Sequence, residues 1–200
     1  MEYKAVIFDL NGVFIRSPFL SDRFRQDFGV PTEEFLSVLK EVMAHVRLPG
    51  ADSVYSRFLP HLQKWGVHLT EEQFLDYWFG AEKEVPEMIT LASGLGARGM
   101  RVIILSNNFR ERAEYYDRNF RFLREMPDAV YYSWRTGLVK PDEAAYRLIM
   151  KENGLRPEEC IYFDDSEKNV SVASALGIRA FDFDGPEQVR TTLRDLGVLS

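Results

Sequence analysis

Cysteine and long apolar runs are nearly absent from this sequence. Cys160 is the single cysteine among 200 residues, which excludes an internal disulfide and suits a reducing compartment. No apolar run approaches the roughly 18 residues of a membrane-spanning helix, and the chain starts with neither a basic leader nor a small-residue cleavage site. We therefore expect a cytoplasmic protein that does not enter a membrane.

An excess of basic charge is absent as well. The chain has 25 lysine and arginine residues against 31 aspartate and glutamate residues, which gives a net charge of −6. This balance argues against binding to nucleic acid through phosphate neutralisation and against attraction to an anionic membrane surface. Internal repeats and low-complexity tracts are also missing, which sets solenoid architectures aside. The sequence does not indicate an oligomeric state.

Apolar residues are plentiful, however. Hydrophobic residues make up 46% of the chain and charged residues 28%, so the chain can form a substantial core. Its length fits one large domain, or one domain with an insertion. Short apolar runs without strict alternation predict strands that are covered on both faces, as in a parallel sheet. These runs are 5–8, 102–105, 161–163, 180–183 and a weaker fifth, 129–132.

Helical patterns lie between most of these strands. One covers 86–98 and is followed by Gly99, another covers 142–152, and a third begins after Ser166 and ends at Gly177. Strands that alternate with helices through short connections predict right-handed crossovers, and therefore an open parallel α/β sheet.

One long stretch interrupts this alternation. After the first strand come about 70 residues without a convincing strand, which is too long for a structureless loop. Thr32 and a capping box at Thr70 each begin a helical pattern rich in Phe, Leu and Trp. We therefore predict a helical subdomain at residues 15–85, inserted into an α/β core made of residues 1–14 and 86–200. Its expected place is above the carboxyl ends of the strands, where open α/β sheets bind ligands.

Polar residues that can carry chemistry follow the predicted strands. Asp9 follows the first strand, Ser106-Asn107 the second and Asp164-Asp165 the third, while Lys140 stands just before a helix. Each of them alone is more often a turn residue, a helix cap or a solvated charge. The carboxyl ends of parallel strands meet at one edge of a sheet, so we expect these side chains to lie together.

Together these residues suit the transfer of a phosphoryl group. Asp9 supplies a carboxylate nucleophile, Ser106 a hydroxyl beside backbone N–H donors, and Lys140 a cation that balances charge on the phosphoryl oxygens. The adjacent carboxylates of Asp164 and Asp165 repel each other, and a divalent cation relieves that repulsion. Mg²⁺ is the expected ion, because proteins hold it with one or two carboxylates together with phosphate and water.

In the order and spacing of its motifs the sequence resembles the haloacid dehalogenase (HAD) superfamily of phosphatases and related hydrolases, over nearly the whole chain. The resemblance implies a Rossmann-like core with a C1-type helical cap. Within the superfamily the chain is most similar to the subgroup of sugar-phosphate phosphatases and the N-terminal phosphatase domain of soluble epoxide hydrolase. The four motifs are matched by Asp9-Leu10-Asn11-Gly12-Val13, Leu105-Ser106-Asn107, Lys140-Pro141 and Asp164-Asp165-Ser166, with Asn169 where a further Asp is often found.

The resemblance implies a metal site and a nucleophile. Asp9 would attack phosphorus, form an aspartyl-phosphate and also bind Mg²⁺. Asn11 would offer its main-chain carbonyl to the same ion. Asp165, helped by Asp164, would complete the metal site.

The resemblance also assigns Ser106 and the backbone N–H of Asn107 to the phosphoryl oxygens, and Lys140 to the charge between nucleophile and phosphate. Asn11 departs from the family pattern, which has an Asp there that protonates the leaving oxygen and later activates water. An amide cannot do this work, which contributes about 10²–10⁴-fold. Three interpretations follow: a slow phosphatase that takes its proton elsewhere, a phosphate-binding protein without turnover, or an inactivating substitution.

Other functions are compatible with parts of this pattern. A haloacid dehalogenase also uses an aspartate nucleophile, but it has no need for the acid pair Asp164-Asp165. A phosphorylation-dependent receiver has an acid pair after its first strand and the phosphorylated Asp later, which is the opposite order. A non-catalytic scaffold of the same fold is supported only by Asn11.

The insertion must select the substrate, because the residues at the sheet edge handle only phosphate. A short cap leaves room for a small phosphorylated metabolite, such as a sugar phosphate. The run of Phe74, Tyr77, Trp78 and Phe79 indicates the interior of the insertion or its contact with the core. The basic residues that could reach an anionic or hydroxylated substrate, although each is more often solvated, are Arg16, Arg23, Arg25, His45, Arg47 and His61.

Overall fold

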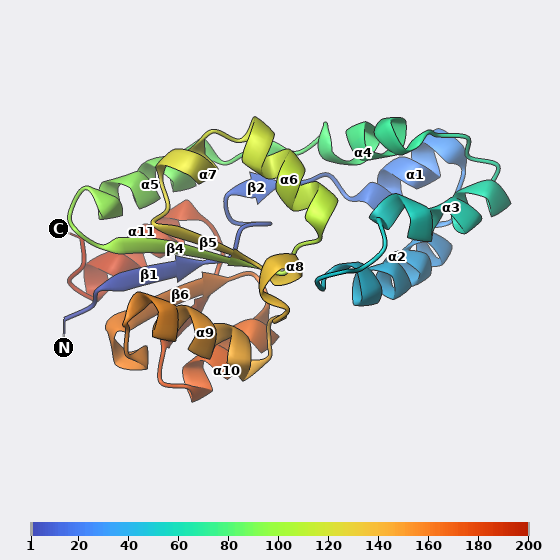
Figure 1. The fold of residues 1–200 in the computed structure, drawn as a ribbon. Helices are drawn as coiled ribbons and strands as arrows, with labels where there is room; N and C mark the ends of the chain where they lie inside the picture. The colour runs from blue at the N-terminus through green and yellow to red at the C-terminus, as the bar shows by residue number, and fades with distance from the viewer. Residues whose placement is uncertain (1, 200) are drawn as a thin grey trace.

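A computed structural model describes residues 2–199 and contains a five-stranded parallel sheet with the strand order β5-β4-β1-β6-β7 (Figure 1). Every neighbouring pair in this sheet is parallel. The predicted α/β fold is confirmed, and all five predicted strands are present with ends shifted by no more than a residue or two. Their bounds are β1 Ala5–Phe8, β4 Arg101–Ser106, β5 Ala129–Tyr132, β6 Cys160–Asp164 and β7 Arg179–Asp182.

Helices cover both faces of the sheet. Val6 and Phe8 of β1 belong to one buried cluster, together with residues of the helices on that face, whereas Ala5 and Ile7 belong to the cluster on the opposite face. Because both faces are covered, the central strands are apolar throughout rather than alternating. The first face carries α5 Pro86–Gly96, α6 Arg110–Asn119, α7 Phe122–Glu125 and α11 Pro186–Asp195, and the second carries α9 Glu143–Asn153 and α10 Glu167–Ala175. Two short elements, α8 Ser133–Thr136 and the 3₁₀ turn Pro157–Glu159, complete the core.

The long stretch after β1 is helical, as predicted. It contains α1 Leu20–Phe28, α2 Thr32–Val46, α3 Val54–Lys64 and α4 Glu71–Phe79. These helices bury a core of their own, with Phe24, Phe35, Phe58 and Phe74 fully enclosed. The predicted capping box at Thr70 is present, because the Thr70 hydroxyl accepts from the backbone of Gln73 while the Gln73 side chain accepts from the backbone of Thr70.

The prediction that this stretch lacks strands is wrong at its two ends. β2 Ile15–Arg16 and β3 Lys83–Glu84 form a short antiparallel ribbon where the chain leaves the sheet and returns to it. Two residues are too few to produce a recognisable strand pattern, which needs about 4–8 residues. The ribbon therefore places the two connections between the core and the insertion side by side.

The insertion lies beyond the carboxyl ends of the strands (Figure 1). Trp78 and Phe79 of α4 pack against Phe109, which directly precedes α6, with ring centroids 5.4 and 5.9 Å apart. The predicted place of the aromatic run, in the interior of the insertion and at its contact with the core, is therefore confirmed. Among residues 2–199 no helix is long and apolar enough to cross a membrane.

Candidate active site

The polar residues predicted to act together meet at the carboxyl edge of the sheet. A cavity of about 600 Å³ lies there, between this edge and the helical insertion. Parallel strands all end at this edge, which is why residues distant in the sequence reach one place. The predicted residues that line the cavity are Asp9, Asn11, Ser106, Asn107, Lys140 and Asp165.

Lys140 is enclosed between two carboxylates. Its Nζ lies 2.8 Å from Oδ1 of Asp9 and 2.6 Å from Oδ2 of Asp164, and the residue is only 3% exposed. Burial disfavours the charged amine, but attraction to these two carboxylates outweighs burial and raises the pKa of Lys140. The lysine is therefore a permanent cation next to Asp9.

For the pKa of Asp9, burial outweighs the attraction of the neighbouring charge. Burial raises the pKa of Asp9 to about 6, with the attraction of Lys140 opposing this rise and the repulsion of Asp164 adding to it. A cation bound beside Asp9 favours the ionised, nucleophilic form of this carboxyl. The positive charge of Lys140 therefore does not fully offset burial and the repulsion of Asp164.

Asp164 is held by four donors. Its Oδ1 accepts from the backbone N–H of Ser166 and from the side-chain amide of Asn169, both at 2.9 Å. Its Oδ2 accepts from Lys140 and from the hydroxyl of Tyr162. These bonds use the usual acceptor positions of the carboxylate, so in this arrangement Asp164 orients Lys140 and anchors the start of α10.

Asp165 is the exposed member of an acidic group. One oxygen each from Asp9, Asp164 and Asp165 lie within 4.8 Å of one another. Among residues 2–199, no hydrogen bond or ion pair joins the Asp165 carboxylate to another residue. Hard carboxylate oxygens at this spacing are the donor set that Mg²⁺ or Ca²⁺ takes, so the residues present fit a divalent cation.

Gly12 leaves room for Asp165. Its φ is +85°, and a Cβ at this position would overlap the Asp165 carboxylate. The turn after β1 therefore requires glycine both for its backbone conformation and for the approach of the acid. This explains the glycine at position 12.

Ser106 and Asn107 complete the opposite wall. The Ser106 hydroxyl is buried and has no hydrogen-bond partner among the described residues. The Asn107 amide donates to the main-chain oxygen of Lys140 at 2.7 Å and accepts from its N–H at 2.8 Å, which fixes the lysine loop to the end of β4. A buried hydroxyl without a partner is costly unless a ligand satisfies it.

A family model described as haloacid dehalogenase-like hydrolase matches residues 3–177, which include all of these site residues. The chain belongs to this family. The resemblance predicted from the four motifs is confirmed, and the chain is a HAD-like hydrolase.

Relatives of this HAD-like chain include whole proteins and parts of longer ones. Phosphatase MT3486 of Mycobacterium tuberculosis is 28% identical over 209 residues, covering 100% of this chain and 96% of that protein. Acyl-CoA dehydrogenase family member 10 of Mus musculus is 26% identical over 211 residues, which cover 98% of this chain and 19% of that protein. The chain thus spans about a fifth of the length of this second relative.

Solved structures share the HAD fold of this chain. The HAD family enzyme BT-2542 of Bacteroides thetaiotaomicron superimposes with a TM-score of 0.77 at 21% identity, covering 91% of this chain and 94% of that one. A structure of the same enzyme in complex with magnesium and inorganic phosphate superimposes with a TM-score of 0.72.

Asn11 of this HAD-like hydrolase points its side chain into a buried polar network. Its amide donates to the hydroxyl of Tyr116 at 2.6 Å. Burial and the negative charge of Glu82 raise the pKa of Tyr116, against the attraction of Arg112. Glu82 forms an ion pair with Arg112 and accepts from the hydroxyl of Ser17 at 2.8 Å. Sequence reasoning missed Glu82, Arg112 and Tyr116, since single polar residues in helical patterns give no signal of a shared site.

Two of the six predicted basic residues of the insertion reach the cavity. Arg16 and Arg47 both line it. Arg23 instead stacks on the ring of Tyr77, with its guanidinium carbon 4.0 Å from the ring centroid. Arg25 forms a 3.7 Å surface ion pair within its own helix.

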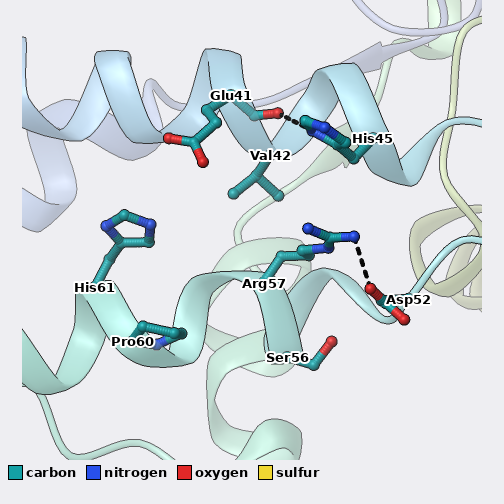
Figure 2. A pocket seen from close by; sticks show the side chains of 8 residues that line it. All are labelled: Glu41, Val42, His45, Asp52, Ser56, Arg57, Pro60 and His61. Atoms are coloured by element: carbon teal, nitrogen blue, oxygen red, sulfur yellow. Dashed lines mark hydrogen bonds and ion pairs between the residues drawn. The ribbon is translucent and has the colours of Figure 1, made fainter.

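His45 and His61 line a different depression. This groove has a volume of about 520 Å³ and lies between α2 and α3. An ion pair of Arg57 with Asp52, 2.7 Å long, borders it (Figure 2). His45 is turned toward its own helix, where its Nδ1 lies 2.9 Å from the main-chain oxygen of Glu41. None of the residues that line this groove also lines the cavity at Asp9.

Proposed function

We propose that this HAD-like hydrolase is a Mg²⁺-dependent phosphatase that hydrolyses a small phosphorylated metabolite through an aspartyl-phosphate. The observation that carries the proposal is the position of Asp9, which lies 2.8 Å from Lys140 and shares an acidic group with Asp164 and Asp165. A cavity of about 600 Å³ above it suits a small metabolite. The phosphatase name of the mycobacterial relative and the magnesium and phosphate bound by BT-2542 support the same function.

The first chemical step is attack by Asp9. A carboxylate oxygen of Asp9 forms a bond to phosphorus while the bond from phosphorus to the leaving oxygen breaks, and the leaving oxygen takes a proton. Lys140 balances charge on the phosphoryl oxygens, and the unpartnered hydroxyl of Ser106 and the backbone N–H of Asn107 donate to them. Water then attacks phosphorus and releases Asp9 as a carboxylate.

The metal would be held at the acidic side of the cavity. Asp9 and Asp165 would bind it through carboxylate oxygens and Asn11 through its main-chain carbonyl, with Asp164 nearby. When bound, Mg²⁺ supplies positive charge that offsets the negative charge of phosphate and acids. Asp165 has room for this task, whereas Asp164 is occupied by its four donors.

Asn11 makes this phosphatase slow. Its amide is bonded to Tyr116 and cannot protonate the leaving oxygen, so the proton comes from water. The helical stretch 15–85 acts as the cap that selects the substrate, over a core formed by residues 1–14 and 86–200. A single buried cysteine suits activity in the reducing cytoplasm.

A screen of phosphorylated metabolites with and without Mg²⁺ tests this function. We expect phosphate release from at least one small phosphate ester with Mg²⁺, and loss of that release when EDTA removes the metal. EDTA-insensitive release of halide from 2-haloacids, without phosphatase activity, would instead identify a dehalogenase. Absence of phosphate release by both the chain and its Asn11→Asp variant would favour a non-catalytic scaffold of the same fold.

Replacing Gly12 by alanine should separate metal binding from folding. The new Cβ would overlap Asp165, so we expect Gly12→Ala to weaken Mg²⁺ binding by about tenfold or more, as loss of one charge-assisted contact would. Gly29→Ala is the matched control, because Gly29 also has a positive φ of 70° but nothing within 4 Å of the added carbon. Both variants should lose about 1 kcal/mol of stability to the left-handed backbone. Titration calorimetry with Mg²⁺ measures the difference, and equal affinities in the two variants would contradict the placement of Asp165 at the metal.

A further inference from the structure

Three arginines line the cavity above Asp9. Arg112 is neutralised by its ion pair with the buried Glu82 and also donates to Ser17 at 3.1 Å. Arg16 is exposed to solvent at the mouth. Arg47 is different, because its Nε is buried and has no hydrogen-bond partner, and no carboxylate among residues 2–199 lies within ion-pair distance of its guanidinium.

The surroundings of Arg47 favour an anion. Burial lowers the pKa of Arg47, repulsion from Arg112 lowers it further, and attraction to Asp9 opposes both. Arginine nevertheless stays charged at physiological pH. A half-buried cation that faces a second cation without an acid of its own is unfavourable, and an anionic group bound beside Arg47 would relieve both the burial and the repulsion.

Arg47 lines the cavity from the insertion. It directly follows α2 in the insertion, whereas Ser106 and Lys140, which would hold the transferred group, belong to the sheet edge. The leaving group extends from phosphorus toward the insertion. A charge on the leaving group is therefore the one that Arg47 can reach.

We propose that the substrate carries a second anionic group, a carboxylate or a second phosphate, on its leaving-group portion, and that Arg47 binds this group. The inference rests on the proposed function for the position of the transferred phosphoryl group. The planar guanidinium of Arg47 suits either anion through paired N–H donors. Arg112 stays paired with Glu82, so Arg47 is the arginine that takes this role.

Non-hydrolysable phosphonates test this inference without turnover. Carboxyalkylphosphonates with one to three methylene groups are compared with alkylphosphonates of equal length. Alkane bisphosphonates are included to test whether the second anionic group is a phosphate. Calorimetry is performed in Mg²⁺ on the wild-type chain, on Arg47→Gln and on Arg25→Gln, a matched control in which an exposed arginine of the insertion is removed.

The wild-type chain should bind the best carboxyl or bisphosphonate ligand about tenfold or more tightly than the alkylphosphonate of equal length, as expected for a charge-assisted contact. Arg47→Gln should reduce this preference to less than about twofold while the alkylphosphonate binds as before, and Arg25→Gln should keep the preference. An equal loss for all phosphonates in Arg47→Gln would mean that Arg47 holds the transferred group. That result, or a preference that survives Arg47→Gln, or no preference in the wild-type chain, overturns the inference. Failure of the phosphatase proposal is seen separately, as absence of phosphate release.

Discussion

Asp9→Asn should abolish phosphate release, with a fall in turnover of roughly 10⁴-fold or more, as seen when other catalytic nucleophiles are removed. The amide keeps the size of the carboxylate but cannot form the aspartyl-phosphate. Lys140 would keep its 2.6 Å contact with Asp164, so the variant should fold normally. Steady-state phosphate release and thermal unfolding measure the two properties.

The control for this experiment is Asp22→Asn, which removes an exposed acid of the insertion that pairs with Arg25 at 3.7 Å. It should retain wild-type turnover. If Asp9→Asn also retained turnover with the fold intact, another residue would have to be the nucleophile and the proposed chemistry would be wrong.

Asn11→Asp should have the opposite effect and raise turnover by about 10²-fold, the lower end of what general acid–base catalysis contributes. The new carboxyl would line the cavity beside Tyr116, whose hydroxyl now accepts from the Asn11 amide at 2.6 Å. Asp9 and Glu82 supply negative charge nearby, which favours the protonated form needed to protonate a leaving oxygen. Dependence on Mg²⁺ should be unchanged, because residue 11 would meet the metal through its main chain.

Asn11→Ala is the matched variant for this gain. It removes the same amide without adding an acid, so its turnover should stay near that of the wild-type chain. Phosphate release by all three proteins at equal Mg²⁺ concentration decides the matter. A folded Asn11→Asp protein without increased turnover would count against the acid–base role of this position.

The sequence predicted much of this architecture because the sheet is covered on both faces. Such strands are short apolar runs, and three of them are followed by a polar residue at the carboxyl edge of the sheet. Asp9, Ser106 and Asp164 could therefore be placed at one edge from the order of elements alone. Lys140 could be placed there only on weaker grounds, its position just before a helix, because its loop follows no apolar run of comparable strength.

The sequence could not predict contacts that depend on how the insertion meets the sheet. Glu82 and Arg112 are 30 residues apart, and their ion pair forms only because the chain returns beside its point of departure. Arg47 and His45 are two positions apart at the end of one helix, yet only Arg47 reaches the cavity, since the two side chains point in different directions around the helix axis. Which donors occupy Asp164 likewise depended on the positions of Tyr162 and Asn169.

The β2–β3 ribbon has a consequence for transplanting substrate specificity between relatives. Ile15 pairs with Glu84 and Arg16 with Lys83, so both connections to the insertion lie at one place. The helices of a relative could therefore replace the insertion there without a change in the strands of the sheet. The residues next to this ribbon also contact the core, however, because Ser17 and Glu82 of the insertion bind Arg112 of α6. A hybrid that omits Glu82 would leave Arg112 buried without its ion-pair partner. The grafted insertion must therefore keep this acid, or Arg112 must be replaced as well.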